Sequence, residues 1–324
     1  MSLNRRDFLN LGGTVALATP FLAVPQLVGA QSTTPVAATV PAYSQRRLGA
    51  FTVTTLLDGT IDIGADFIAG FDQAAADTAL ARQHLPNFAD PMAIPILGYI
   101  IDTGTQKIAV DCGTVDGFAP RVAGYHQALT QAGIDAADID VVLLTHMHPD
   151  HLGGLSQGTT RRFPNAEIHV SAVEYDFWHG SVADAMPDQM QPFVQIARGM
   201  IAPYNDRIKT FGTDAEVIPG VQAVALPGHT PGHVGFRFNS QGQDLLIWGD
   251  LIHLTKLQFD QPDWTIAFDM DPAVTKATRA KMLDMAAKDG LLVTGSHLDF
   301  PGFGYVDRTA SGYHFAPAAH DYML

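Results

Sequence analysis

The sequence predicts an α/β fold in which two β-sheets pack against each other and helices cover their outer faces. Three observations support this prediction. Apolar strands alternate with helical stretches along the chain, both halves are rich in strands, and no linker of distinct composition separates the halves. The 324 residues are 47% hydrophobic and 16% charged, so one large core can form. Strand-rich halves that each carry helices are typical of stacked layers.

The first half of this layout contains several apolar runs with strand character. These runs predict strands at 51–59, 96–113, 140–144 and 167–171. The second run is two strands around a turn at Gly104. Helical periodicity predicts helices over 119–133 and 190–204, and Gly133 ends the first of them.

The second half repeats this style. Short apolar runs predict strands at 221–226, 234–239, 244–250 and 291–295. The helix predicted over 271–290 has clear ends. Asp271 is placed as its N-cap, Pro272 as its first residue and Gly290 just after its last turn.

The first thirty residues have the pattern of a twin-arginine export signal. Arg5 and Arg6 precede an apolar run that ends in the small-residue site Val-Gly-Ala. A membrane anchor is the alternative, but glycines and prolines interrupt the run and it is short for a spanning helix. We therefore expect a periplasmic or secreted protein without a stable membrane anchor. Residues 31–47 are interpreted as a loose lead-in and 48–324 as one domain.

Charge and cysteine content narrow the range of partners. The formal net charge of −14 argues against nucleic acid, whose phosphates need a basic protein face, and it does not exclude a neutral or cationic substrate. Cys112 is the one cysteine, so no intrachain disulfide forms. Its place at the end of an apolar strand predicts a buried structural thiol rather than a metal ligand.

The stretch "THMHPDHLGG", residues 145–154, follows the apolar strand predicted at 140–144. His146 and His148 alternate along an extended segment, so both imidazoles can reach one ion. Asp150 and His151 lie at the following turn and point elsewhere, which suits a second ion. Metal ligation is a stronger interpretation of this stretch than a set of surface histidines, because further donors occur at other strand ends.

Three other apolar strands are also followed by metal-ligand residue types. Together with the first stretch they give seven candidate ligands: His146, His148, Asp150, His151, His229, Asp250 and His297. Imidazole and carboxylate without thiolate suit zinc, manganese, iron or cobalt. Asp250 is the natural candidate for a carboxylate that bridges two cations.

These motifs resemble those of the metallo-β-lactamase superfamily. "THMHPDHLGG", "GHTPGH" and "WGD" are similar to its metal-binding motifs, and the resemblance covers residues 48–324. "FPNAEIHVSAVEYDFW", "WGDLIHLTKLQFDQP" and "HLDFPGFGYVDRTASGYHFAP" resemble the methyl parathion hydrolase-like group of exported organophosphate and ester hydrolases. The resemblance implies an αβ/βα four-layer sandwich of two mixed sheets, and it suggests a homodimer.

The family pattern implies a role for each donor. His146, His148 and His229 resemble the ligands of one metal ion. Asp150, His151 and His297 resemble those of the other, and Asp250 bridges the two ions. His233 matches a position outside the ligand set, so we expect it to support the site. Zinc is the expected metal for both ions, and manganese, cobalt or iron also suit these ligands.

The resemblance further implies a hydrolase in which a metal-bridging hydroxide cleaves aryl esters, lactones or phosphotriesters. Asp250 and His253 are the candidate catalytic residues. The candidate substrate-binding residues are Phe118, Trp178, Phe193, His253 and Phe268. For the aromatic residues, ordinary core packing is the alternative.

His253 departs from the family pattern. Acyl-homoserine lactonases of the superfamily often have a tyrosine at this position, and the organophosphate relatives have an aliphatic residue. His253 matches neither pattern, so it weakens the phosphotriester assignment more than the hydrolase assignment. An acyl-homoserine lactone lactonase is the alternative function; the missing tyrosine counts against it, and both functions stay open. A β-lactamase is disfavoured, because Asp250 stands where thiolate-type lactamases have cysteine. An iron oxidoreductase or a non-catalytic binding protein is disfavoured by the complete ligand set.

Overall fold

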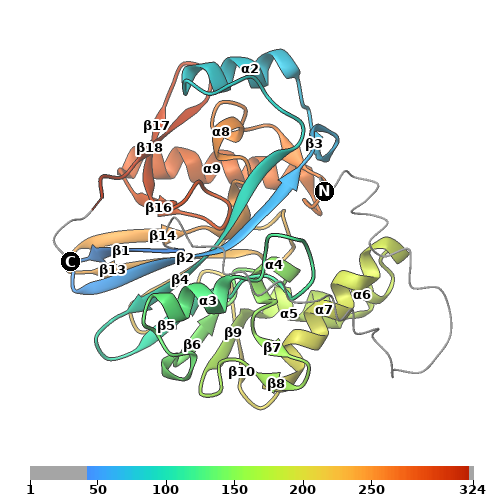
Figure 1. Cartoon of the computed structure of the whole chain (residues 1–324), viewed down its shortest axis with the longest axis vertical. Helices are drawn as coiled ribbons and strands as arrows, with labels where there is room; N and C mark the ends of the chain where they lie inside the picture. Colours follow the sequence, from blue (N-terminus) through green and yellow to red (C-terminus); the bar gives the residue numbers. More distant parts are fainter. Residues whose placement is uncertain (1–41, 321–324) are drawn as a thin grey trace, which may run out of the picture.

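The computed structural model describes residues 42–320, and two seven-stranded mixed sheets dominate it (Figure 1). The strand order of the first sheet is β1 (Tyr43–Leu48), β2 (Phe51–Ile63), β4 (Met92–Asp102), β5 (Lys107–Val110), β6 (Val141–Leu143), β9 (Glu167–Ser171) and β10 (Ile208–Phe211). That of the second is β11 (Glu216–Ile218), β12 (Val221–Ala225), β13 (Val234–Ser240), β14 (Gln243–Ile247), β16 (Leu292–Thr294), β17 (Gly304–Arg308) and β18 (Tyr313–Pro317).

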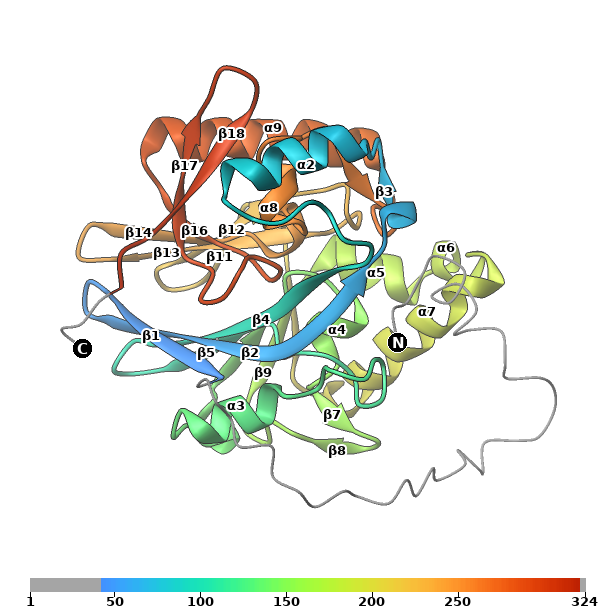
Figure 2. The same ribbon diagram turned by 45° about the horizontal axis from the view of Figure 1, so that its top comes forward.

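Helices cover the outer face of each sheet. On the first sheet lie α3 (Tyr125–Gln131), α4 (Pro149–Leu152), α5 (Ala172–His179), α6 (Ser181–Asp184) and α7 (Gln191–Ile201). On the side of the second sheet lie α2 (Gln73–Arg82), α8 (Thr255–Gln258) and α9 (Pro272–Asp289). Two short pairs, β3 (Ile68–Ala69) with β15 (Thr265–Ile266) and β7 (Ser156–Gln157) with β8 (Thr160–Arg161), complete the strands. Figure 2 shows the resulting layers, as the four-layer sandwich requires.

One hydrophobic core lies between the two sheets, because alternate residues of each strand point to opposite faces. Leu97 and Tyr99 of β4 pack in one buried cluster with Phe236 and Phe238 of β13. Ile100, which lies between the inward-facing residues of β4, belongs instead to the cluster beneath α3, α5 and α7. Both faces of the central strands are therefore buried, which explains why these strands are apolar throughout.

Several predicted elements are confirmed. Residues 167–171 form β9 with the predicted bounds. In α9, the Asp271 carboxylate accepts hydrogen bonds from the backbone N–H groups of Ala273 and Val274, and Gly290 ends the helix with a φ of 58°. Capping by a side-chain oxygen and a left-handed glycine at the end are the features that the sequence predicted for this helix.

The helix predicted over 119–133 is wrong at its start, because α3 begins only at Tyr125. The buried Asp58 carboxylate accepts hydrogen bonds from the N–H groups of Ala123 and Tyr125 at 3.1 and 2.9 Å. The backbone oxygen of Asp58 accepts another from Gly124. These bonds hold the preceding residues in a loop against β2, where Ala123 adopts a positive φ of 69°. A distant carboxylate has overridden local helical periodicity.

The loose lead-in predicted over 31–47 also needs correction at its end. Tyr43–Leu48 form β1, which pairs with β2 in antiparallel register from Tyr43↔Leu56 to Leu48↔Phe51. "YSQRRL" has no apolar alternation, so the pairing partner rather than local sequence determines this strand. The predicted export signal, residues 1–30, lies outside the described residues and stays a prediction.

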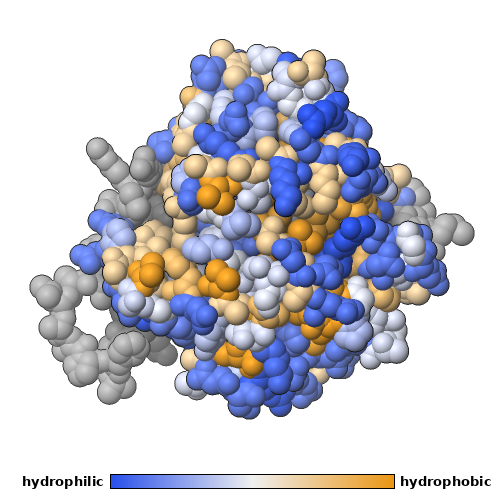
Figure 3. Space-filling view, turned by 180° about the vertical axis from the view of Figure 1, so that it is seen from behind, coloured by the Kyte–Doolittle hydropathy of each residue, from blue (hydrophilic) through white to orange (hydrophobic). Residues whose placement is uncertain are grey.

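The described surface is mixed in polarity. Viewed from behind, hydrophobic residues form small separate patches among hydrophilic ones (Figure 3). The large apolar side chains that are exposed are Val173, Val182, Val274 and Tyr305. Within residues 42–320, no helix combines the length and the hydrophobicity that crossing a membrane requires.

Candidate metal centre

The seven predicted ligands come together where four loops meet at one edge of the two sheets. The loops follow β6, β12, β14 and β16, so residues far apart in sequence converge. The side chains that they bring together are His146, His148, Asp150, His151, His229, Asp250 and His297. β6 and β16 are buried along their whole length and β14 over its last three residues, so rigid strands position these loops, as is common for functional sites.

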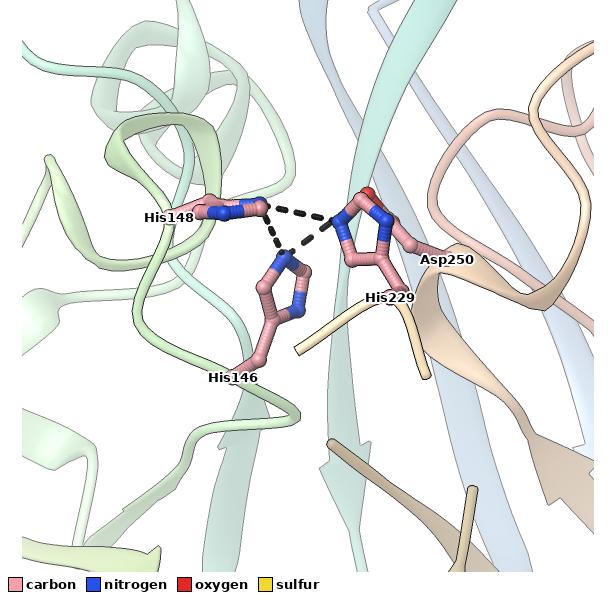
Figure 4. Close-up of side chains that lie close together, drawn as sticks. All are labelled: His146, His148, His229 and Asp250. Carbon is pink, nitrogen blue, oxygen red and sulfur yellow. Dashed lines mark hydrogen bonds and ion pairs between the residues drawn. The ribbon is translucent and has the colours of Figure 1, made fainter. Parts of the chain in front are cut away.

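The three-histidine group consists of His146, His148 and His229 (Figure 4). His148 Nδ1 lies 3.0 Å from His146 Nε2 and 2.9 Å from His229 Nε2. All three side chains are buried. Three imidazole nitrogens that converge at such distances form a cradle suited to one cation.

The mixed group consists of Asp150, His151 and His297. Asp150 Oδ2 lies 3.6 Å from His151 Nε2 and 3.5 Å from His297 Nε2. The ligand atoms of this group lie within 4.8 Å of one another. The same limit holds for the three-histidine group together with Asp250. The stretch 145–154 therefore does divide its donors between two groups, as its alternation predicted.

Asp250 lies between the two groups. Its Oδ2 is 3.3 Å from His229 Nε2 and 3.2 Å from His297 Nε2, while its Oδ1 is 3.2 Å from His151 Nε2. The side chain is buried. Its two oxygens face histidines of both groups, which is the placement that a bridging carboxylate needs.

A sharp turn presents Asp250 to the site. The strand predicted over 244–250 ends early, because Gly249 turns the chain with a φ of 54°. A Cβ at Gly249 would lie 2.5 Å from His233 Nε2. That nitrogen accepts a hydrogen bond from the Asp250 N–H, and His233 Nδ1 donates to the Leu226 carbonyl. Both nitrogens of His233 are thus occupied, so it supports the turn, as predicted, and does not join the donors.

The hydrogen bonds around the site fix the tautomers of three histidines. Each Nδ1 lies 2.8 to 2.9 Å from an acceptor oxygen: His151 from Asp111, His229 from Asp269 and His297 from the Pro95 carbonyl. A proton on Nδ1 leaves the Nε2 lone pair free toward the cluster. His151 Nε2 and Asp250 Oδ1 are buried without a hydrogen-bond partner. This donor set fits a divalent metal ion such as zinc.

Electrostatics agree with that fit. Burial holds the pKa values of His146 and His148 well below the usual range, so both are neutral. Burial also acts to lower the pKa of His229, but hydrogen bonds to Asp250 and Asp269 outweigh it and raise this pKa to about 9. Burial acts to raise the pKa of Asp250, yet the surrounding histidines hold it well below normal. Without a metal ion, His229 is therefore protonated on both ring nitrogens at neutral pH, because Asp250 and Asp269 favour a positive charge beside them. A metal ion would supply that charge in place of the Nε2 proton and leave the imidazole neutral, which is its ligand form.

His253 lies against both groups. Its Nε2 is 3.1 Å from Asp250 Oδ2, and its ring stacks on that of His297 with centroids 5.0 Å apart. Burial is the main cause that lowers its pKa to about 4, so it is neutral at neutral pH. Because the Asp250 oxygen can only accept, Nε2 carries the proton and Nδ1 is left as an acceptor. Nδ1 is buried and has no hydrogen-bond partner in the described chain.

An apolar pocket lies directly on the donors. Phe118, Phe193, Phe268 and His253 line it, as the sequence predicted, with Ile61 and Ile94 and the donors His148, Asp150, His229, Asp250 and His297. The pocket is narrow, with a volume of about 30 Å³. Phe118 and Phe193 meet edge to face at 6.3 Å across it. Side chains have to move before a substrate of ordinary size can enter.

Trp178 does not line this pocket, contrary to the prediction. It is fully buried behind His148, with ring centroids 5.7 Å apart. A larger cavity of about 640 Å³ lies beside the β17–β18 hairpin. It contains none of the seven donors, so the chemistry of the small pocket rather than cavity size identifies the candidate active site.

Three buried carboxylates next to the site were missed by sequence reasoning. Asp111 accepts from His151 and from both the N–H and Oγ1 of Thr145. Asp269 binds His229, and Glu174 binds the backbone on either side of the three-histidine group. Asp111 also follows an apolar strand, so the rule that found the ligands could have found it. Nothing in the sequence marks Asp269 or Glu174 as a neighbour of the site.

Comparisons with known proteins identify relatives for this arrangement. A model of the metallo-β-lactamase superfamily matches residues 93–297. An N-acyl homoserine lactonase of Bacillus cereus is 24% identical over 236 residues, which is 67% of this chain and 85% of that protein. An N-acyl homoserine lactonase of a Bacillus species is 28% identical over 214 residues, which is 60% of this chain and 78% of the relative.

Solved structures give the same picture. The hydrolase AbOPH, described as a member of the β-lactamase superfamily, superposes with a TM-score of 0.82 at 29% identity, over 87% of this chain and 99% of its own. AidC, described as a dizinc quorum-quenching lactonase in complex with a product N-hexanoyl-homoserine, has a TM-score of 0.79 at 26% identity. That match covers 86% of this chain and 98% of AidC.

Proposed function

The chain belongs to the metallo-β-lactamase superfamily and is a hydrolase, and we propose that it uses two divalent metal ions, most readily zinc, to open the ester ring of N-acyl homoserine lactones. His146, His148 and His229 would hold one ion. Asp150, His151 and His297 would hold the other, with Asp250 between them. The lactonase relatives and the dizinc lactonase neighbour support this proposal.

The metal ions, when bound, supply a hydroxide nucleophile at neutral pH and polarise the ester carbonyl. Hydrolysis joins the oxygen of water to the carbonyl carbon and breaks the ring C–O bond, after which the leaving oxygen takes a proton. The chain itself orients Asp250 through the turn at Gly249 and through His233. The phenylalanines of the pocket exclude water and receive an apolar acyl chain.

His253 provides the observation that favours an N-acyl lactone over other esters. Its Nδ1 is an acceptor without a partner, at a residue that lines the pocket. A buried acceptor is stabilised by a substrate group that donates a hydrogen bond. The amide N–H of an N-acyl homoserine lactone is such a donor. Phosphotriesters and simple aryl esters carry none.

The test uses the protein loaded separately with zinc, manganese or cobalt. We would count metals per chain and measure kcat/KM for N-hexanoyl homoserine lactone, its N-methyl amide analogue, dihydrocoumarin, a p-nitrophenyl ester and methyl parathion. We expect two metals per chain and the homoserine lactone fastest. Methylation of the amide should cost about 10-fold, the value of one hydrogen bond.

His253→Leu is the matched control for this comparison. It keeps the seven donors, so metal content should be unchanged, and the two homoserine lactones should then react at similar rates. Methyl parathion as the fastest substrate, or an N-methyl analogue that reacts as fast as its parent in the wild type, would contradict the proposal.

An aryl ester or phosphotriester hydrolase is the second candidate. Three phenylalanines line the pocket and favour an aromatic substrate. Its two carboxylates, Asp150 and Asp250, both belong to the donor groups, so among the described residues no further charged side chain is left in the pocket to bind a charged substrate. The resemblance of "WGDLIHLTKLQFDQP" to the methyl parathion hydrolase-like group supports the same candidate. The ranking of methyl parathion against the lactones in the experiment above decides between the two candidates.

A further inference from the structure

Glu174 is a buried carboxylate that belongs to neither donor group. It lies in the first turn of α5 and is fully buried. The sequence "SAVE" is the capping-box pattern, which predicts that the glutamate side chain returns to the N–H of Ser171. Within residues 42–320, the Glu174 side chain makes no such bond and uses both of its oxygens elsewhere. Ser171 Oγ does accept from the Glu174 N–H at 3.4 Å, but the glutamate carboxylate binds Met147 and Thr230 on the loops of the site.

The carboxylate of Glu174 accepts four hydrogen bonds. Oε1 accepts from the Met147 N–H at 3.0 Å and from Trp178 Nε1 at 2.7 Å. Oε2 accepts from Thr230 Oγ1 at 2.7 Å and from the Gly232 N–H at 3.0 Å. An ionised carboxylate offers about four acceptor positions and no donor, so its capacity is filled by matching groups.

These bonds connect the loops that carry the three-histidine group. Met147 lies between His146 and His148 on the loop after β6 of the first sheet. Thr230 follows His229 on the loop before β13 of the second sheet. The loop also passes very close to α5, because a Cβ at Gly232 would lie 2.1 Å from the Glu174 nitrogen. Glu174 therefore sets how far the histidines of one sheet stand from the histidine of the other.

Trp178 adds a contact from behind. Its ring lies edge-on to His148 at 5.7 Å, and its Nε1–H donates to the same Glu174 oxygen as Met147. His148 is thus constrained through its backbone neighbour and through its ring. Within residues 42–320, Glu174 makes no hydrogen bond to the mixed group. Asp111 and the Pro95 carbonyl hold the histidines of that group instead.

We propose that Glu174 is a positioning residue that sets the metal affinity of the three-histidine group and leaves that of the mixed group unchanged. The inference rests on the proposed two-metal function, but not on the identity of the substrate. Groups that orient metal ligands from outside are typically worth 10- to 100-fold in metal affinity. A glutamine at this position would turn an NH₂ group toward two donors and lose two of the four bonds.

The experiment measures metal binding to the full chain by competition between zinc and a chromophoric chelator, with cobalt absorption spectra as a second readout. For E174Q we expect one of the two zinc ions to bind 10- to 100-fold more weakly and the other to bind as in the wild type. The cobalt spectrum of the weakened site should change. E216Q, at an exposed glutamate of β11, is the matched control and should bind both ions normally.

A purely structural role of Glu174 predicts a different result. E174Q would then lower the melting temperature of the metal-free protein and bind both ions with the affinity of the wild type. That result overturns the proposal, as does equal weakening of both sites.

If E174Q does not fold, the variants T230V and T230S provide the same test. Valine removes the hydroxyl that donates to Glu174, and serine keeps it. T230V should weaken one site and T230S should recover it, and equal behaviour of the pair overturns the proposal. Wild-type protein that binds two ions but opens no lactone would overturn only the proposed function.

Discussion

The three-histidine group and the mixed group differ in where their negative charge lies. The mixed group contains its own carboxylate, Asp150, whose side chain is 15% exposed. The three-histidine group has only imidazoles, and its carboxylates stand outside it: Asp269 on His229 and Glu174 on the backbone. Asp250 faces both groups.

This difference has a consequence for metal binding. Asp150 would offset one of the two charges of a divalent ion in the mixed group directly, whereas an ion in the three-histidine group would depend on Asp250 and on carboxylates that do not touch it. Charges act strongly over such distances in a buried site, where water does not screen them. We therefore expect the three-histidine group to be more sensitive to changes in residues that touch no metal.

Asp250→Asn should have the largest effect, because it removes the charge that the two groups share. We expect fewer than two metals per chain and a loss of turnover beyond the roughly 10²–10³-fold that a single electrostatic contact contributes. Elemental analysis after dialysis, together with kcat/KM on the best substrate, checks this. Full metal content with an unchanged rate would exclude a bridging role for Asp250.

Asp269→Asn and Asp111→Asn test the asymmetry itself. Asp269 contacts only His229 among the donors, so its replacement should weaken one zinc ion, by about 10- to 100-fold. Asp111 binds His151 of the mixed group and also Thr145, next to His146, so its replacement should weaken both ions. Chelator competition on the two variants gives the comparison.

The opposite pattern would show that the groups are not held independently. If Asp269→Asn weakened both ions equally, the site would behave as one unit through Asp250. The distinction between direct and indirect charge would then have no consequence for binding.

Much of this centre could be predicted from the sequence because its donors obey a local rule. Each ligand follows an apolar strand, and alternation along residues 146–148 separates donors that share an ion from those at the next turn. The layers could be predicted for a similar reason, since strands buried on both faces are apolar throughout, as in "VVL" of β6.

The missed features depend on contacts between distant residues. Asp269 is 40 residues from His229, and Asp58 shapes the start of α3 from 65 and 67 residues away. The strand β1 has no apolar alternation and forms by pairing with β2. Trp178 was expected in the pocket because of the family resemblance, with core packing as the alternative. Its Nε1–H requires an acceptor when buried, and Glu174 provides that acceptor behind the site.

Replacement of His233 should have the smallest effect, a change in how the free energy of unfolding depends on pH. This prediction tests whether His233 supports the site without being a metal ligand. Burial lowers its pKa to about 3, against 6.5 when exposed. Above pH 6.5 the folded and unfolded chains both hold it neutral, so its contribution to stability is fully present. As the pH falls from 6.5 toward 3, only the unfolded chain takes up the proton, and stability is lost. The slope is about 1.4 kcal/mol per pH unit for one proton.

His233→Gln removes this titration. Urea unfolding of the metal-free variant between pH 6 and 4 should therefore show a free energy of unfolding that changes less steeply with pH than in the wild type, by close to one proton. The variant should also be less stable at neutral pH, because the bonds to the Asp250 N–H and the Leu226 carbonyl are weakened. Equal slopes in the two proteins would mean that His233 takes up a proton in the folded state. The turn at Gly249 would then tolerate a charged imidazole beside Asp250. A neutral His233 would no longer be a feature that distinguishes this residue from the metal ligands.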